Sequence, residues 1–292
     1  MNQCNYIYYL NNINIYIYIY YFRKNIKFGG SSKGTLDVYY DKASVKDLKP
    51  VVIYAHGGAW IGGDKDDDEY LGKFISKDGY VAVSLNYILF PKGDFDDMVD
   101  DVYKAIQWTY NNIEKYGGNK NKITLSGYSA GAHLMALTTF KAALRMENNN
   151  KYLEPLPRAE RLVLFNCPAD FDDYDAAFHL FDDTSKVNNG IVKNIVSFLV
   201  NSKDVSPTDI LQGFGNKSLT DFGFPTITVF HGGKDELVPA YSSENFIAQL
   251  KRVLSKTKVN DVYRATYDHA TLVQGSKNNK ELQKLLLDIL KM

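Results

Sequence analysis

From Thr35 onward, short apolar runs alternate with longer stretches in which apolar residues recur at helical spacing. The runs VVIYA at 51–55 and YVAVSLNY at 80–87 are apolar at most positions, which is typical of strands buried on both faces of a parallel sheet. Residues 96–116 place apolar side chains on one face of a helix that stops at two glycines. This alternation predicts the α/β fold class, with a mostly parallel central sheet flanked by helices.

The same pattern predicts the other elements of the domain. We expect further strands at 35–40, 123–125, 161–165, 226–230 and 262–267, and helices at 130–144 and 280–290. The alternation fails between Asp170 and Pro225. A long irregular insertion in a compact enzyme domain is typical of a lid, so we expect a helical lid at about 171–222, with a surface decoration as the alternative.

The first 33 residues differ from the rest, because Ile, Tyr and Asn dominate them. They lack the charged start and the small-residue cleavage site of a secretory signal. Asparagines interrupt their apolar stretch, which is shorter than a comfortable membrane helix, so membrane association through it is left open but not favoured. We expect residues 1–33 to form a low-complexity extension and residues 34–292 to form one domain.

Composition narrows the partners and the compartment. The 34 basic and 34 acidic residues cancel, so nothing favours nucleic acid, which attracts basic surfaces. Cys4 and Cys167 alone cannot build a disulfide framework or a zinc site, and a reducing, cytoplasmic location fits best, with an endomembrane-associated one as the alternative. We interpret the acidic run at 64–69 as a solvated helix start rather than a metal site.

Residues 127–131 read Gly-Tyr-Ser-Ala-Gly and match the G-x-S-x-G nucleophile elbow, a strained turn between a strand and a helix. Side chains at Gly127 and Gly131 would obstruct the close approach of these two elements. The helix N-terminus behind Ser129 favours developing negative charge. The pentapeptide alone is common, but a strand and a helix are predicted on either side of it, so Ser129 is the predicted nucleophile.

The motif HGGAW at 56–60 follows a buried strand and matches a loop that supplies backbone N–H groups to an oxyanion hole. We expect Gly57, Gly58, Ala59 and Ala130 to form this hole, with the N–H groups of the last three as donors. Each such donor lowers the barrier of acyl transfer by about 3 kcal/mol. An ordinary glycine turn is the alternative for the motif taken by itself.

Chain order selects the other two catalytic side chains, since in folds with such an elbow the nucleophile comes first in the sequence, then the acid, then the histidine. His269 lies between the last predicted strand and the final helix, and is the predicted general base. Asp235 follows an earlier strand and is predicted to orient it. The alternative acids are Asp170, Asp172 and Asp173, but their crowding favours solvated surface carboxylates.

The other four histidines receive different predictions. We expect His56 to hold the oxyanion loop, and His133 to pack or form hydrogen bonds one helical turn after the nucleophile. His231 is expected to shape the loop of the acid, and His179 falls in the expected lid.

With these motifs in place, the chain resembles the α/β-hydrolase carboxylesterases, in the branch that includes hormone-sensitive-lipase-like esterases, kynurenine formamidases and prenylcysteine methylesterases. The likeness is strongest to prenylcysteine methylesterases and covers most of residues 35–292. The segments that carry it are HGGAWIGGDK, NYILFPKGDFDDMVDDVYKAIQW, NNIEKYGGNKNKITLSGYSAGAHL and VSP at 205–207. The resemblance implies the α/β-hydrolase fold, ester hydrolysis, and the triad and oxyanion residues named above.

We therefore expect a serine carboxylesterase that hydrolyses a small ester through an acyl-enzyme and needs no cofactor or metal. A prenylcysteine methyl ester is one candidate substrate. The alternatives are a kynurenine formamidase-like amidohydrolase and a catalytically weak ligand-binding protein on a hydrolase scaffold. The sequence leaves the oligomeric state open.

Overall fold

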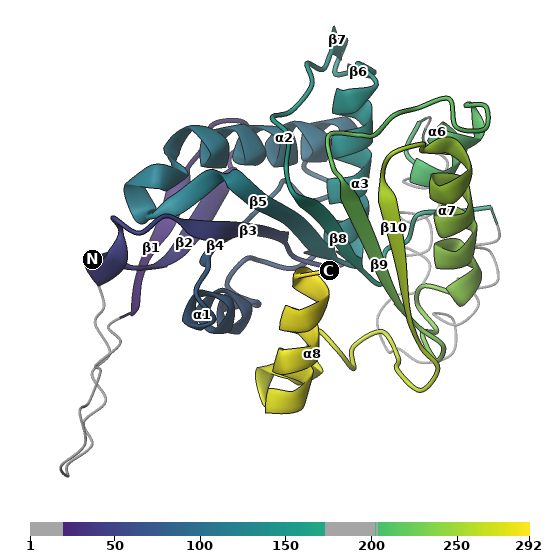
Figure 1. Ribbon diagram of the computed structural model, residues 1–292. Coiled ribbons are helices and arrows are strands. Elements are labelled where there is room, and N and C mark those ends of the chain that lie inside the picture. Colours follow the sequence, from purple (N-terminus) through teal and green to yellow (C-terminus); the bar gives the residue numbers. More distant parts are fainter. Residues whose placement is uncertain (1–19, 173–201, 203) are drawn as a thin grey trace.

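The computed structural model describes residues 20–172, 202 and 204–292 (Figure 1). Eight strands form one sheet in the order β1-β2-β4-β3-β5-β8-β9-β10. Strand β2 is antiparallel to both of its neighbours, and the pairs from β4 to β10 are parallel. The predicted α/β class, with a mostly parallel sheet flanked by helices, is confirmed. His179 and most of the expected lid lie outside the described residues.

The strands of this sheet are β1 (Tyr20–Lys27), β2 (Thr35–Asp41), β3 (Lys49–Ala55), β4 (Val81–Leu85), β5 (Gly118–Tyr128), β8 (Arg161–Phe165), β9 (Thr226–Gly232) and β10 (Lys258–Arg264). A small hairpin consists of β6 (Glu147–Asn148) and β7 (Lys151–Tyr152). The helices are α1 (Glu69–Lys77), α2 (Phe95–Asn112), α3 (Ala130–Ala143), α6 (Pro207–Gln212), α7 (Ala240–Val253) and α8 (Lys280–Leu290). Single 3-10 turns lie at Lys42–Ser44, Ile113–Tyr116 and Gly275–Lys277.

Helices cover both faces of the sheet (Figure 1): α2, α3 and α7 pack on one face, and α1 and α8 on the other. Strand β3 shows the consequence. Val51, Ile53 and Ala55 belong to the core under the first set of helices, whereas Val52 and Tyr54 belong to the core under the second. Alternate side chains of a strand point to opposite faces, so a strand covered on both sides must be apolar throughout.

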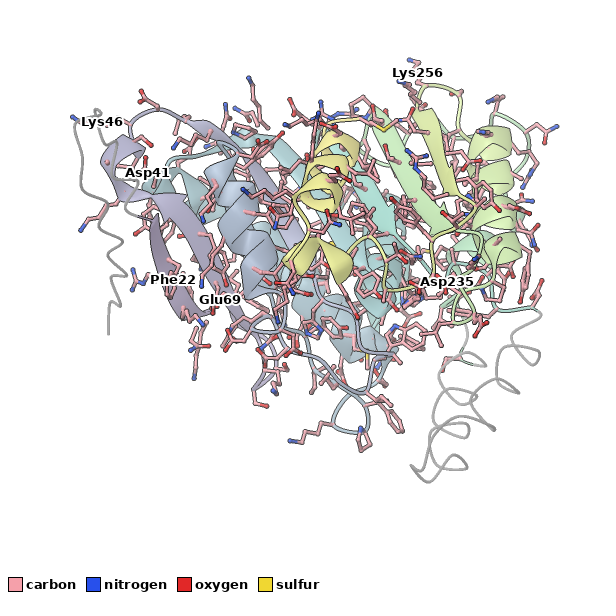
Figure 2. The ribbon with its side chains drawn as sticks, turned by 90° about the horizontal axis from the view of Figure 1, so that it is seen from below. Phe22, Asp41, Lys46, Glu69, Asp235 and Lys256 are labelled. Carbon is pink, nitrogen blue, oxygen red and sulfur yellow. The ribbon has the colours of Figure 1, made fainter. Side chains whose placement is uncertain are left out.

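Strand β1 corrects the expected boundary at residue 33. The segment Tyr20–Lys27 pairs with β2, so the sheet begins inside the stretch that the sequence assigned to an extension. Lys24 Nζ lies 2.7 Å from Glu69 Oε2 of α1, and the ring of Phe22 packs against that of Tyr39 (Figure 2). These contacts with the core make β1 an edge strand of the domain. Residues 1–19 lie outside the described part of the chain.

The carboxyl ends of the parallel strands meet at one edge of the sheet, which is where open α/β sheets bind ligands. Asp235 lies toward this edge, and Lys46 and Lys256 lie at the opposite one (Figure 2). The segments that leave β5, β9 and β10 here carry Ser129, Asp235 and His269, and the loop after β8 carries the alternative acids. None of the helices in the described ranges has the length and apolar composition needed to span a bilayer.

Candidate active site

Ser129 lies between β5 and α3 with φ 53°, in the left-handed region that non-glycine residues rarely adopt. Its N–H donates to Phe165 O at 2.9 Å, and its carbonyl accepts from His133 N–H at 3.0 Å. These bonds hold the strained turn from both sides. The predicted strand, turn and helix around Ser129 are therefore present.

The two glycines of the motif allow the strand and the helix to meet. A Cβ atom on Gly131 would lie 2.3 Å from Ala55 O, and one on Gly127 would lie 2.5 Å from the backbone of Gly131. Both obstacles are backbone atoms, which cannot move aside. The close approach of strand and helix, predicted from the sequence, is therefore the reason why both positions are glycine.

The HGG loop lies directly beside the serine, since a Cβ atom on Gly57 would be 3.2 Å from Ser129 Cβ. Gly58 and Ala59 both have positive φ, 124° and 49°. Within the described ranges, the N–H groups of Gly58, Ala59 and Ala130 donate to no protein acceptor. Unpaired backbone donors next to a serine hydroxyl are what an oxyanion hole requires.

His56 holds this loop, as the sequence predicts. Its Nδ1 lies 2.7 Å from Gly57 O, and its ring stacks on Tyr87 with centroids 4.5 Å apart. The Tyr87 hydroxyl donates to His56 O at 2.9 Å. Burial lowers the pKa of His56, so the ring is neutral and acts as a fixed part of the loop.

Asp235 and His269 form a direct hydrogen bond, with 2.8 Å between Oδ2 and Nδ1. The Asp235 side chain is 1% exposed and that of His269 is 12% exposed. The other oxygen of Asp235 accepts from the N–H groups of Leu237 at 3.0 Å and Val238 at 2.8 Å, bonds that fix the orientation of the carboxylate. With Nδ1–H directed at this carboxylate, Nε2 is the basic nitrogen of a neutral imidazole.

Sequence reasoning missed two residues that contact this pair. Asn166 donates from Nδ2 to Asp235 Oδ2 at 2.7 Å, and the Tyr128 hydroxyl donates to His269 O at 3.0 Å. Tyr128 occupies the variable second position of the elbow motif, and Asn166 follows β8 without a motif of its own. No local pattern could reveal either contact, since the partners lie 69 and 141 residues apart.

Residues 36–250 match the family model BD-FAE. The chain belongs to the BD-FAE family. Among its relatives, the probable isoprenylcysteine alpha-carbonyl methylesterase ICMEL2 of Arabidopsis thaliana is 28% identical over 83% of this chain and 57% of that protein. Esterase LipC of Mycobacterium tuberculosis is 25% identical over 82% of this chain and 57% of that protein. The chain spans little more than half the length of these curated relatives.

Solved structures share the fold of this BD-FAE chain. Esterase B from Lactobacillus rhamnosis superimposes with a TM-score of 0.70 at 17% identity, covering 93% of this chain and 85% of that one. A truncated carbohydrate esterase from gut microbiota gives 0.68 at 18% identity, covering 92% and 95%. The chain therefore has the α/β-hydrolase fold. The BD-FAE match ends before His269.

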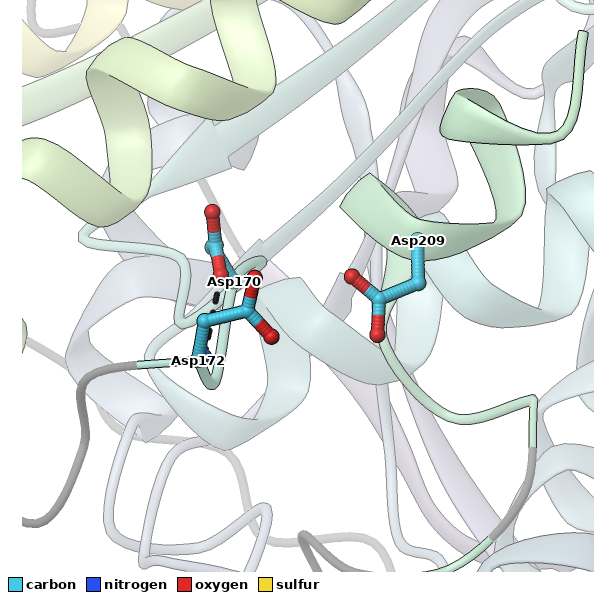
Figure 3. Close-up of side chains that lie close together, drawn as sticks. All are labelled: Asp170, Asp172 and Asp209. Atoms are coloured by element: carbon cyan, nitrogen blue, oxygen red, sulfur yellow. Dashed lines mark hydrogen bonds between the residues drawn. The ribbon is translucent and has the colours of Figure 1, made fainter.

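Two of the alternative acids, Asp170 and Asp172, follow β8 and lie close to Asp209 of α6 (Figure 3). Asp170 is buried and accepts from Asn245 Nδ2 at 3.0 Å and from Asp172 N–H at 3.1 Å, so its interpretation as a solvated carboxylate is wrong. In the part of the chain that is described, it makes no hydrogen bond with His269. Asp173 lies outside that part.

Asp170, Asp172 and Asp209 bring carboxylate oxygens within 4.8 Å of one another, close enough to hold a metal ion (Figure 3). Burial, followed by the charges of the other two carboxylates, raises the pKa of Asp209. Asp172 and Asp209 are exposed, and exposed acidic groups commonly cluster without a metal. The cluster alone therefore does not identify a metal site.

His133 and His231 form hydrogen bonds away from the catalytic pair. His133 Nδ1 accepts from Trp60 Nε1 at 3.2 Å and Nε2 donates to Val205 O at 2.7 Å, while burial lowers the pKa of its ring to about 4. The prediction of a hydrogen-bonding role for His133 is confirmed. His231 contacts Asp261 of β10 at 2.9 Å, rather than the loop of the acid that it was expected to shape.

The acidic run at 64–69 is not uniformly solvated, which corrects its interpretation. Lys65 within it is buried and lies 3.3 Å from the buried Asp37 of β2. Burial, followed by the charge of Asp67, raises the pKa of the Asp68 carboxyl to about 7. The run continues the oxyanion loop, which folds back onto the sheet edge and takes these side chains into the interior.

Proposed function

We propose that this BD-FAE protein is a serine carboxylesterase that hydrolyses a small carboxylic ester through an acyl-enzyme on Ser129. The observation that carries the proposal is the 2.8 Å hydrogen bond between Asp235 and His269, which leaves Nε2 as a base at the edge where the strained serine lies. The esterase names of the relatives support the same class of reaction.

In this mechanism, His269 Nε2 takes the proton of Ser129 as Oγ attacks the ester carbonyl carbon. The N–H groups of Gly58, Ala59 and Ala130 stabilise the tetrahedral oxyanion. The imidazolium, held by the Asp235 carboxylate, gives its proton to the leaving alcohol. Water repeats the cycle on the acyl-enzyme, with His269 again as base. The cycle requires neither metal nor organic cofactor.

The names of the relatives guide the choice of the first substrate. The Arabidopsis relatives are named as isoprenylcysteine methylesterases, which supports a prenylcysteine methyl ester as the first substrate to test. The Trp60 ring after the oxyanion loop meets those of Phe95 and Phe171 edge to face, but Trp60 and Phe95 are core side chains and do not define the substrate. None of the relatives named above is a formamidase, so N-formylkynurenine serves as the comparison.

The test of mechanism combines labelling by a fluorophosphonate probe with turnover of a short-chain aryl ester. Ser129→Ala is expected to abolish labelling and to reduce kcat by about 10⁴-fold or more. Ser126→Ala is the matched control, because Ser126 is buried in β5, three residues before Ser129, and its hydroxyl has no hydrogen-bond partner among the described residues. Labelling that persists in Ser129→Ala, or a wild type inactive on a broad ester panel, would contradict the proposal.

A further inference from the structure

The end of β8 lies between the turn that holds Ser129 and the loop that holds Asp235. In the sheet, β8 pairs with β5 on one side and β9 on the other (Figure 1). Phe165 O accepts the N–H of Ser129 at 2.9 Å, and the next residue, Asn166, donates from Nδ2 to Asp235 Oδ2 at 2.7 Å. One pair of adjacent residues therefore connects the nucleophile turn to the carboxylate.

Asn166 is placed there at a structural cost. It is 1% exposed, its φ is 49°, and its Oδ1 has no hydrogen-bond partner among the described residues. Asparagine tolerates left-handed backbone better than most residues, but a buried unpaired acceptor is unfavourable. Its N–H donates to Phe230 O at 2.9 Å, so the backbone is fixed by β9 while the amide is directed at Asp235.

The oxygen that Asn166 contacts is the one that His269 uses. Oδ2 of Asp235 thus accepts one N–H from Asn166 and one from His269. Oδ1 accepts two backbone N–H groups, those of Leu237 and Val238. Four donors on one buried carboxylate prevent its rotation. Titratable groups next to the pair include Tyr128, whose hydroxyl is bonded to His269 O, and Asp268 beside His269. Lys234 and Glu236 flank Asp235 in the chain.

We propose that Asn166 is a positioning residue that keeps the Asp235 carboxylate aligned with His269. This inference rests on the proposed function, because it assigns the residue a part in the same reaction. Asn166 acts only through the carboxylate. Its loss should therefore lower kcat and leave KM unchanged.

Asn166→Leu removes the donor at similar size, and we expect kcat to fall about 10- to 100-fold, the loss of a hydrogen bond to a charged group. Asn148→Leu is the matched control. Asn148 is 2% exposed, donates from Nδ2 to Asp96 O at 2.8 Å, and also has an unpartnered Oδ1 among the described residues. Its replacement should lower stability without changing kcat, because it lies on the β6 hairpin away from the catalytic pair.

Asn166→Asp tests the charge. Two carboxylates in hydrogen-bond contact cannot both be ionised at low cost, so at acidic pH they share a proton and the introduced carboxyl group again acts as a donor. When the pH rises and that proton leaves, repulsion displaces Asp235. We expect activity near the wild-type level at acidic pH and a new fall of kcat at alkaline pH that the wild type lacks.

The outcomes separate the two proposals. A wild type without esterase activity overturns the proposed function. An active wild type whose kcat is unchanged in Asn166→Leu overturns the positioning role alone, as does an Asn166→Asp pH profile parallel to the wild-type profile. If Asn166→Leu does not fold, as judged by circular dichroism, the Asn166→Asp profile decides.

Discussion

Removing Lys65 from the buried pair with Asp37 should destabilise the protein strongly and in a pH-dependent way. The side chains of Lys65 and Asp37 are 2% and 0% exposed, and Nζ lies 3.3 Å from Oδ1. That oxygen also accepts from Asn25 N–H at 2.7 Å, whereas Oδ2 is buried without a partner among the described residues. The variant Lys65→Met keeps the apolar stem of the side chain and removes only the charge.

The expected loss is about 3–5 kcal/mol at neutral pH, the usual result of leaving a buried charge unpaired. For a domain of this size it corresponds to a fall in Tm of roughly 6–15 °C. Burial already raises the pKa of Asp37 in the wild type, and removal of Lys65 raises it further. A raised carboxyl pKa means that stability is lost as pH rises through that pKa, so the loss should shrink at acidic pH.

Urea denaturation of the wild type and Lys65→Met at about pH 4.5 and pH 7.5 measures this difference. Asp37→Leu combined with Lys65→Met should recover much of the stability, because an apolar pair leaves no buried charge. Lys24→Met is the control, since the partly exposed pair of Lys24 with Glu69 contributes at most about 1 kcal/mol. An equal loss at both pH values, or a double variant no better than Lys65→Met, would refute the reasoning.

Three further predictions follow from other contacts. Gly131→Ala should abolish activity and lower the free energy of unfolding by several kcal/mol, because its Cβ would lie 2.3 Å from Ala55 O. Gly213→Ala is the control and should be tolerated, since the nearest atom to a Cβ there is 3.4 Å away. Thermal melts and ester turnover compare the two variants. The pKa of His133 is lowered to about 4, so its contribution to stability is lost as pH falls from 6.5 toward 4, and His133→Gln should flatten that slope in denaturation curves. The pKa of Asp68 is raised to about 7, so the protein loses stability as the pH rises toward and through 7 and this buried carboxyl ionises. Asp68→Asn should therefore be more stable than the wild type at about pH 8 and equal to it near pH 4. A difference between the two proteins at the lower pH would count against this cause.

Sequence patterns predicted best those strands and helices whose apolar residues form a regular buried face. The strand predicted at 161–165 and the helix predicted at 280–290 coincide with β8 and α8. Strand β10 begins at Lys258, four residues before its predicted start. The sequence missed these four residues because three of them, Lys258, Asn260 and Asp261, are polar and all four are exposed or half-buried. Helix α7 was not predicted, although its buried residues, including Phe246 and Leu250, recur at helical spacing.

Local sequence was enough to specify the nucleophile turn and the oxyanion loop. Each is a contiguous motif in which glycine stands where the backbone leaves no room for a side chain. A few neighbouring residues therefore define the local geometry. The order of Ser129, Asp235 and His269 along the chain also identified the two partners that the structure brings into hydrogen-bond contact.

What holds these side chains in place became visible only in the folded chain. Asn166 contacts Asp235 and Tyr128 contacts His269 because the sheet sets particular strands and loops side by side. The buried pair of Lys65 and Asp37, away from these side chains, was hidden from the sequence for the same reason. No residue type signals such a contact, since strand order is the outcome of packing the whole chain. A motif fixes local backbone conformation, whereas the environment of a catalytic side chain depends on residues far away in sequence.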